Sequence, residues 1–309
     1  MAVLRPMIRS KFMIRWMNIA QMENTEYTPE KPNTERRVRP PDRQPMKQLD
    51  AQDIRNMKGK EKIACLTAYN APVARALDAA GLHLILVGDS VGTTELGYAS
   101  TLPVTLDDML RHTAAVVRGT SHALVVADMP FMTYQESPAQ ALRNAGRFLQ
   151  ETGCGAVKLE GGAFRAPTIR ALVQNGIPVC AHVGLTPQSH AQLGYRVQGR
   201  GDAAAAQLLA DARAVADAGA FAVVLECIPA DLARAVTEAV SIPTIGIGAG
   251  PHCDGQVLVL HDILGMGGAI HPRFAKCYVD LAAQIQTAAE TYKSEVQSGA
   301  YPGPEHQYT

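Results

Sequence analysis

The chain has 309 residues, 47% of them hydrophobic, and its 29 lysine and arginine side chains balance 29 acidic ones. A neutral chain has no general attraction for nucleic acids or anionic membranes, and none of its apolar runs approaches the ~20 residues of a membrane span. The length is enough for two domains or for one α/β barrel of ~250 residues.

Residues 1–46 differ in composition from the rest of the chain. The stretch before Glu23 contains several arginines but no acidic residue, and residues 28–44 are rich in Pro, Thr, Glu and Arg. A basic, amphipathic start is typical of an organelle transit peptide, whereas a polar, proline-rich stretch is typical of disorder. We expect a disordered N-terminal extension over 1–46, or a true start at Met22, ahead of one catalytic domain over 47–309.

The six cysteines show no paired spacing of the kind that binds metals. Three of them, Cys154, Cys180 and Cys227, lie in or beside predicted strands, where a thiol behaves as a small core residue. We therefore expect free thiols in a reducing compartment, and so a cytoplasmic protein, or a mitochondrial one if the N-terminus is a transit peptide.

A short helix is predicted to begin at Asp50, and short apolar runs then alternate with longer helical segments. Apolar runs of this length are typical of parallel strands that are buried on both faces. The expected strands cover residues 63–67, 84–87, 123–127, 155–159, 177–181, 220–225, 242–245 and 257–264. The expected helices cover residues 71–80, 138–152, 166–176, 202–218, 229–240 and 274–298, with another that starts at Thr105.

This series of about eight β-then-α units repeats roughly every 30 residues, the size of one βαβ step. Eight such units close most economically into a (β/α)8 barrel (TIM barrel) of the α/β class, and a doubly wound open sheet is the alternative. The polar insertion over residues 184–201 is long for a compact domain, and loops of that length are usually functional or mobile.

Three carboxylates, Asp89, Asp128 and Glu160, follow three consecutive predicted strands. The carboxyl ends of parallel strands converge on one mouth of a barrel, so we expect these side chains to lie together. Crowded carboxylates repel one another unless a cation neutralises them, and hard oxygen ligands suit Mg²⁺. Each acid alone could instead cap the next helix, but three in consecutive units favour a Mg²⁺ site.

Lys158 lies two residues before Glu160 on the same predicted strand, so both side chains should point into the barrel. A lysine in that position needs a partner. It could pair with one of the acids, bind a carboxylate or carbonyl of the substrate, or form a Schiff base. A metal that polarises a carbonyl would make the Schiff base unnecessary.

Several further polar groups are expected at the same mouth. Glu226 ends an apolar strand away from the metal, which suits a general base, although it could also be an ordinary acid at a helix N-terminus. His182 could be a proton shuttle, an oxyanion donor or a structural histidine. Ser90 could donate to a bound anion, and the glycine-rich turn over 246–250 could bind phosphate or simply allow close packing.

Together these groups predict an aldol-type reaction. A divalent metal and a lysine would bind and polarise a 2-oxo acid, and a base would remove the adjacent C–H proton. The resulting metal-stabilised enolate would attack an electrophilic carbon.

From about Asp50 to its C-terminus, the chain resembles the ketopantoate hydroxymethyltransferase (3-methyl-2-oxobutanoate hydroxymethyltransferase) family. The motifs that carry the resemblance are GDS at 88–90, STLPVT at 100–105, ADMPF at 127–131, VKLEGG at 157–162, HVGLTPQ at 182–188, VQGR at 197–200 and GIGAG at 246–250. Many separate motifs in the same order make the resemblance specific.

The resemblance implies a decamer of (β/α)8 barrels that transfers a one-carbon unit from 5,10-methylenetetrahydrofolate to 3-methyl-2-oxobutanoate. The product, 2-dehydropantoate (ketopantoate), leads to pantothenate and coenzyme A. By position, the resemblance implies a magnesium site of Asp89, Asp128 and Glu160, oxo-acid contacts at Asp89, Ser90, Asp128 and Lys158, and Glu226 in VLEC as the proton acceptor.

Two departures from the family pattern do not touch these residues. Asn70 stands where members often have Asp, and Arg196 stands where Lys is common. Three rival functions remain: a carboxylate-and-magnesium lyase, a non-catalytic metabolite-binding barrel, and a sugar-phosphate enzyme that uses the 246–250 turn. The lyase would need a mobile cysteine-bearing loop, and the binding barrel would need to have lost the base or a metal ligand.

Overall fold

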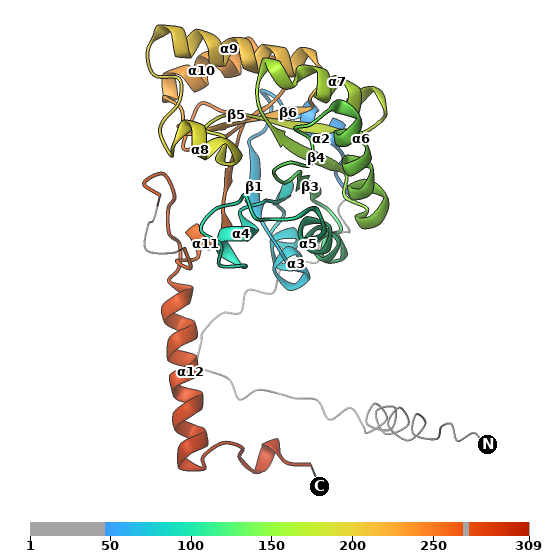
Figure 1. The fold of residues 1–309 in the computed structure, drawn as a ribbon. Coiled ribbons are helices and arrows are strands. Elements are labelled where there is room, and N and C mark those ends of the chain that lie inside the picture. The colour runs from blue at the N-terminus through green and yellow to red at the C-terminus, as the bar shows by residue number, and fades with distance from the viewer. Residues whose placement is uncertain (1–46, 268–271, 309) are drawn as a thin grey trace, which may run out of the picture. The chain divides into compact units, whose positions relative to one another are not determined.

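The computed structural model describes residues 47–267 and 272–308. The extension expected over residues 1–46 therefore lies outside the described residues. Among the described residues, eight parallel strands close into a barrel in chain order, with β1 beside β8 (Figure 1). This arrangement confirms the predicted (β/α)8 barrel and excludes the open sheet. The strands are β1 Ile63–Thr67, β2 Leu84–Val87, β3 Leu124–Asp128, β4 Ala156–Glu160, β5 Val179–Gly184, β6 Ala222–Glu226, β7 Thr244–Ile247 and β8 Gly255–Leu258.

Helices alternate with the strands and surround the barrel (Figure 1). The longer ones beside the barrel are α3 Ala71–Ala79, α5 Leu106–Gly119, α6 Pro138–Arg147, α7 Ala166–Gln174, α9 Asp202–Asp217 and α10 Ala230–Ala239. Shorter segments are α2 Ala51–Asn56, α4 Val91–Thr94, α8 His190–Leu193, α11 Leu260–Ile263, the π-helical turn η1 Phe148–Thr152 and the 3₁₀ turns η2 Ala163–Arg165, η3 Pro187–Ser189 and η4 Pro304–His306. The capping box predicted at Thr105 is present, since its side chain accepts from the Asp108 N–H while Asp108 accepts from the Thr105 N–H.

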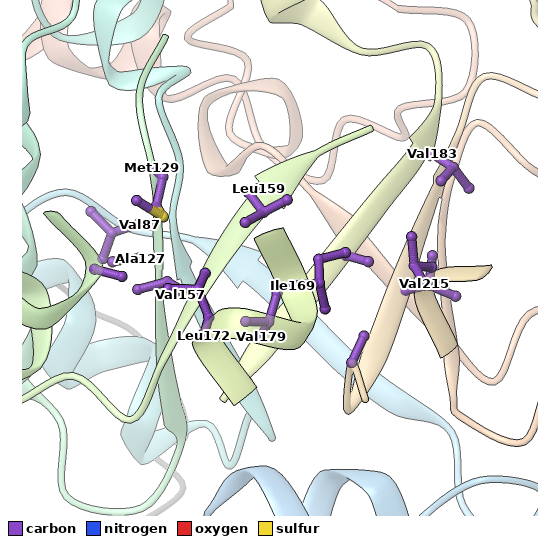
Figure 2. Close-up of a cluster of buried hydrophobic side chains, with 14 of the residues drawn as sticks. Val87, Ala127, Met129, Val157, Leu159, Ile169, Leu172, Val179, Val183 and Val215 are labelled. Atoms are coloured by element: carbon purple, nitrogen blue, oxygen red, sulfur yellow. The ribbon is translucent and has the colours of Figure 1, made fainter. Parts of the chain in front are cut away.

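Alternate residues of each strand face opposite sides of the barrel wall. On β4, Val157 and Leu159 pack outward in the same buried cluster as Ile169 of α7 (Figure 2), whereas Ala156 belongs to the cluster inside the barrel. Burial of each such aliphatic side chain contributes about 1.5–3 kcal/mol, so the outer layer holds the strands in place. The same period of two points the intervening residues of β4 into the barrel, as predicted.

Two predictions near the C-terminus were wrong. The strand expected over 257–264 is β8, which begins at Gly255 and ends at Leu258. Its first residue lies so close to the backbone of Ile63 on β1 that a side chain there would collide with it. After β8 the Leu260 N–H donates to the Thr67 hydroxyl and the chain turns into α11. The helix expected over 274–298 is α12 Leu281–Ser298, whose start is set by the Asp280 carboxylate capping the Ala283 N–H.

The last helix and one part of the barrel wall are both open to solvent. No residue of α12 is buried, and Ile285, Tyr292 and Val296, spaced for one helix face, are about half exposed. On the outer side of β1 and β8, the exposed Ala64 and Gln256 border a groove of about 560 Å³. Among the described residues, no helix is both long and apolar enough to cross a membrane.

Candidate active site

The three carboxylates predicted as metal ligands lie in one cavity at the carboxyl ends of the strands. Asp128 and Glu160 are the last residues of β3 and β4, and Asp89 follows β2 by two residues. All three are buried, and they border a cavity of about 110 Å³. The other predicted site residues border the same cavity, namely Ser90, Lys158, His182 and Glu226.

Lys158 forms a buried ion pair with Asp128. The two residues are direct neighbours across β3 and β4, which explains why they meet. Burial lowers the pKa of Lys158, but Asp128, Glu160 and Asp89 outweigh that effect and raise the pKa above its ordinary value. The lysine is therefore an ammonium ion, which suits anion binding and does not suit Schiff-base chemistry, since that needs the free amine.

The cavity holds more negative than positive charge. Burial, followed by repulsion from Asp128 and Glu160, raises the pKa of Asp89 to about 8. Four carboxyl groups, including Glu226, face only two basic side chains, Lys158 and His182, in this cavity, so a divalent cation would relieve the repulsion that raises this pKa.

Hydrogen bonds divide the carboxylate oxygens of the cavity into two groups. Oδ2 of Asp128 accepts from the Asp89 N–H at 3.1 Å, and its other oxygen faces Lys158. Oδ2 of Asp89 and Oε2 of Glu160 each accept a hydrogen bond from Gln188 of the 184–201 insertion. Among the described residues, no donor is hydrogen-bonded to Oδ1 of Asp89 or to Oε1 of Glu160, and these are the atoms left for a cation.

The carboxylate oxygens that accept no hydrogen bond suit Mg²⁺ as two of its ligands. Within the described residues, no group of three or more acidic, histidine or cysteine side chains is arranged so that the group could hold a metal ion by itself. Mg²⁺ does not require one, because it usually keeps several waters and binds through one or two carboxylates together with its substrate. The free oxygens of Asp89 and Glu160 supply two such ligands, while Asp128 is largely occupied by Lys158.

His182 lies between two carboxylates. Its Nε2 is 3.2 Å from Oε2 of Glu226, and its Nδ1 is 3.6 Å from Oε1 of Glu160. Burial and the Lys158 charge lower the pKa of His182, but the two glutamates dominate and raise it to about 9. The ring therefore links the candidate base to the candidate metal site.

Glu226 stands at a strained turn. Cys227, the next residue, has a φ of 49°, in the left-handed region that residues other than glycine seldom adopt. Backbone strain of this kind costs about 1–3 kcal/mol and gathers at functional sites. The 184–201 insertion is anchored here, since the Leu185 N–H donates to the Glu226 carbonyl and the Gln198 N–H to the Cys227 carbonyl.

Two residues of the site, Gln188 and Tyr134, were missed by the sequence analysis. The buried Gln188 side chain donates to Oδ2 of Asp89 at 2.9 Å, and its backbone N–H donates to Oε2 of Glu160 at 3.1 Å. The Tyr134 hydroxyl donates to Oε1 of Gln188 at 2.7 Å and accepts from the Glu160 N–H at 3.1 Å. Gln188 is the last residue of the HVGLTPQ motif, which could have indicated that it belongs to the site. Tyr134 lies in none of the motifs.

The other sequence predictions at this mouth have simpler outcomes. Ser90 has its hydroxyl 2.8 Å from that of Tyr69. The glycine-rich turn allows close packing, because side chains at Gly248 and Gly250 would collide with Phe274 and Ala230. These two glycines border the groove outside β1 and β8, not the carboxylate cavity, so the phosphate interpretation of the turn has no support.

Comparison with known proteins identifies the relatives of this chain. A family model described as ketopantoate hydroxymethyltransferase matches residues 48–304. A protein of Chloroflexus aurantiacus named 3-methyl-2-oxobutanoate hydroxymethyltransferase is 58% identical over 259 residues, which cover 84% of this chain and 92% of the relative. A protein of Streptomyces coelicolor with the same name is 55% identical over 261 residues, with 84% and 90% covered.

Solved structures show the same fold at much lower sequence identity. The 2,3-dimethylmalate lyase structure, described as a PEP mutase/isocitrate lyase superfamily member, aligns with a TM-score of 0.54 at 18% identity, over 84% of this chain and 91% of that one. A phosphonopyruvate hydrolase complex with oxalate and Mg²⁺ aligns with a TM-score of 0.54 at 15% identity, over 83% and 92%. The family match and the relatives above 50% identity agree with each other: this chain belongs to the ketopantoate hydroxymethyltransferase family.

Proposed function

We propose that this chain transfers a one-carbon unit from 5,10-methylenetetrahydrofolate to 3-methyl-2-oxobutanoate and so makes 2-dehydropantoate, in the first step of pantothenate biosynthesis. The observation that carries the proposal is the single cavity in which Lys158, His182 and Glu226 face the three acids. Relatives that are 58% and 55% identical over the aligned residues bear the name of this activity.

The buried acids would hold Mg²⁺, with the free oxygens of Asp89 and Glu160 as direct ligands and Asp128 alongside them. When bound, Mg²⁺ would polarise the carbonyl of the oxo acid and stabilise the negative charge that develops there. Asp128 also fixes Lys158, which stays charged and can bind the carboxylate of the oxo acid. The Ser90 hydroxyl lies on the same cavity and can donate to that substrate.

Glu226 would act as the base, because its carboxylate faces the cavity and does not share the Lys158 pair. It would take the proton from C3 of the oxo acid. Water would add to the one-carbon unit as both of its C–N bonds break, so that tetrahydrofolate leaves with the two protons of the water on its nitrogens. The electron pair left on C3 would then form the new bond to the released aldehyde carbon, whose oxygen takes the proton held by Glu226 and becomes the hydroxyl of the product. His182, whose Nε2 is 3.2 Å from Oε2 of Glu226, would hold the carboxylate toward the cavity as its ion-pair partner.

An assay of the purified chain with Mg²⁺ tests this proposal against the rival functions. Mass spectrometry would follow 2-dehydropantoate from the oxo acid and methylenetetrahydrofolate, and in parallel would follow cleavage of 2,3-dimethylmalate and phosphonopyruvate. The proposal predicts product only from the first pair. Cleavage of either of the others without transfer would favour a lyase or hydrolase, and no reaction at all would favour a binding barrel.

We further propose a cytoplasmic homo-oligomer, with a decamer as the expected size. All six cysteines are free, as expected for a reducing compartment. The apolar face of α12 is unburied in a single chain, and so is the outer wall of β1 and β8. Exposed apolar surface of this kind is usually covered in an assembly.

A further inference from the structure

Gln188 makes every hydrogen bond that its side-chain amide allows. The two amide N–H groups donate to Oδ2 of Asp89 and, at 3.0 Å, to the carbonyl of Met129. The amide oxygen accepts from the Tyr134 hydroxyl and, at 3.0 Å, from Nε2 of Gln135. A flipped amide would place its oxygen against a carboxylate and a carbonyl, so the partners fix its orientation.

The bonds around Gln188 form a directed chain between the two open carboxylates. The Glu160 N–H donates to the Tyr134 hydroxyl, which in turn donates to the Gln188 amide oxygen. The other end of that amide donates to Asp89, and the Gln188 backbone N–H returns to the Glu160 side chain. Each carboxylate therefore has one oxygen held by Gln188 and one oxygen that accepts no hydrogen bond, which on Glu160 faces Nδ1 of His182 at 3.6 Å.

We infer that Gln188, held by Tyr134, is a positioning residue that turns the free oxygens of Asp89 and Glu160 toward the cation. This inference rests on the proposed magnesium site and adds to it the groups that orient its ligands. Partners of metal-binding carboxylates typically change metal affinity by 10–100-fold when they are removed, because an unheld ligand must be ordered at each binding event. The turn η3 is what carries Gln188 into the mouth, and the residue is buried there.

The test is the affinity of the purified chain for Mn²⁺, as a spectroscopic substitute for Mg²⁺, measured by electron paramagnetic resonance without any substrate. Gln188→Met keeps the length of the side chain and removes all four amide bonds, so we expect the dissociation constant to rise 10–100-fold. Tyr134→Phe removes one hydroxyl and should raise the dissociation constant for Mn²⁺ by a smaller factor. The double variant should show less than the product of the two single effects, because both act on one network.

Gln192→Leu is the matched control, since Gln192 is an exposed glutamine of the same insertion. Its affinity should equal that of the unaltered chain. Unchanged affinity in both Gln188→Met and Tyr134→Phe would overturn the inference, while the magnesium site would stand if Asp89→Asn abolishes binding. If the unaltered chain binds no Mn²⁺ or Mg²⁺, both the inference and the proposed metal site are wrong.

Each affinity would be compared with the thermal unfolding temperature of the metal-free variant. A merely structural role for Gln188 would lower that temperature and leave the affinity of the remaining folded protein unchanged. That outcome would also contradict the inference, which requires the affinity itself to change.

Discussion

Nε2 of His182 lies 3.2 Å from Oε2 of Glu226, and the other nitrogen of the same ring faces Glu160 on the neighbouring strand. The candidate base and a candidate metal ligand are thus the two neighbours of one buried ring. In the proposed mechanism, this ring lies between the group that would remove the substrate proton and a group that would hold the cation.

Glu226→Gln should keep the fold and the metal affinity but lose most turnover. The amide is the same size as the carboxylate but cannot accept the C3 proton, and general base catalysis typically contributes 10²–10⁴-fold. The measurement is kcat beside Mn²⁺ affinity and circular dichroism. Unchanged turnover would remove Glu226 from the mechanism.

His182→Asn should lower kcat by about 10–100-fold, the range for a group that orients metal-site and reactive carboxylates. The shorter side chain cannot reach Glu226 and Glu160 together. Turnover assays over a range of oxo-acid concentrations would separate kcat from KM. A variant whose kcat is normal would show that the ring has only a packing role.

Lys158→Met should destabilise the metal-free chain by about 3–5 kcal/mol at neutral pH, because Asp128 would remain buried without its partner. Urea unfolding would measure this loss. The double variant Lys158→Met with Asp128→Asn should recover part of the stability, since it removes the stranded charge. If the single and double variants were equally unstable, the ion pair would not be the cause.

The hydrogen bonds of the Asp78 carboxylate lead us to expect that acid lowers the stability of the chain. Burial would raise its pKa, but the N–H groups of Ala123 and Ser121 and the Ser121 hydroxyl outweigh burial and lower the pKa below 3.8. A lowered folded pKa means that the stabilisation is present above about pH 4 and is lost as the pH falls through the folded value. Asp78→Asn should lose about 1.5–3 kcal/mol at pH 7 and show a smaller further loss on acidification. Parallel pH dependence in both proteins would contradict this account.

Substitution on the apolar face of α12 should reduce the size of the assembly. Ile285→Asp and Tyr292→Asp each put a charge where we propose that another copy packs. Light scattering after size-exclusion chromatography should show a smaller species, whereas Gln286→Asp, on another face of the helix, should not. An unchanged mass for both face variants would show that α12 does not join copies.

The site residues on the strands could be predicted because the period of two along a strand determines which side chains point into the barrel. On β4, the period of two puts Lys158 and Glu160 inside the barrel. Parallel pairing then sets Asp128 beside Lys158 and Glu160 beside His182. None of these contacts requires knowledge of a loop.

The parts contributed by loops could not be predicted in this way. Gln188 reaches the carboxylates because a 3₁₀ turn folds the insertion back into the mouth, and Tyr134 lies in an irregular segment after β3. No periodicity describes either path. The start of β8 was missed for a related reason: Gly255 is a poor strand former by propensity, but the close approach of Ile63 on β1 requires glycine there.

The most direct test of the central claim is deuterium exchange at C3 of 3-methyl-2-oxobutanoate, followed by nuclear magnetic resonance with Mg²⁺ or with EDTA. The experiment would be run with no folate and again with tetrahydrofolate, which carries no transferable carbon. The proposed function predicts exchange that needs the metal and is lost in Glu226→Gln. Absence of exchange with Mg²⁺ present, in both conditions, would contradict proton removal by this site.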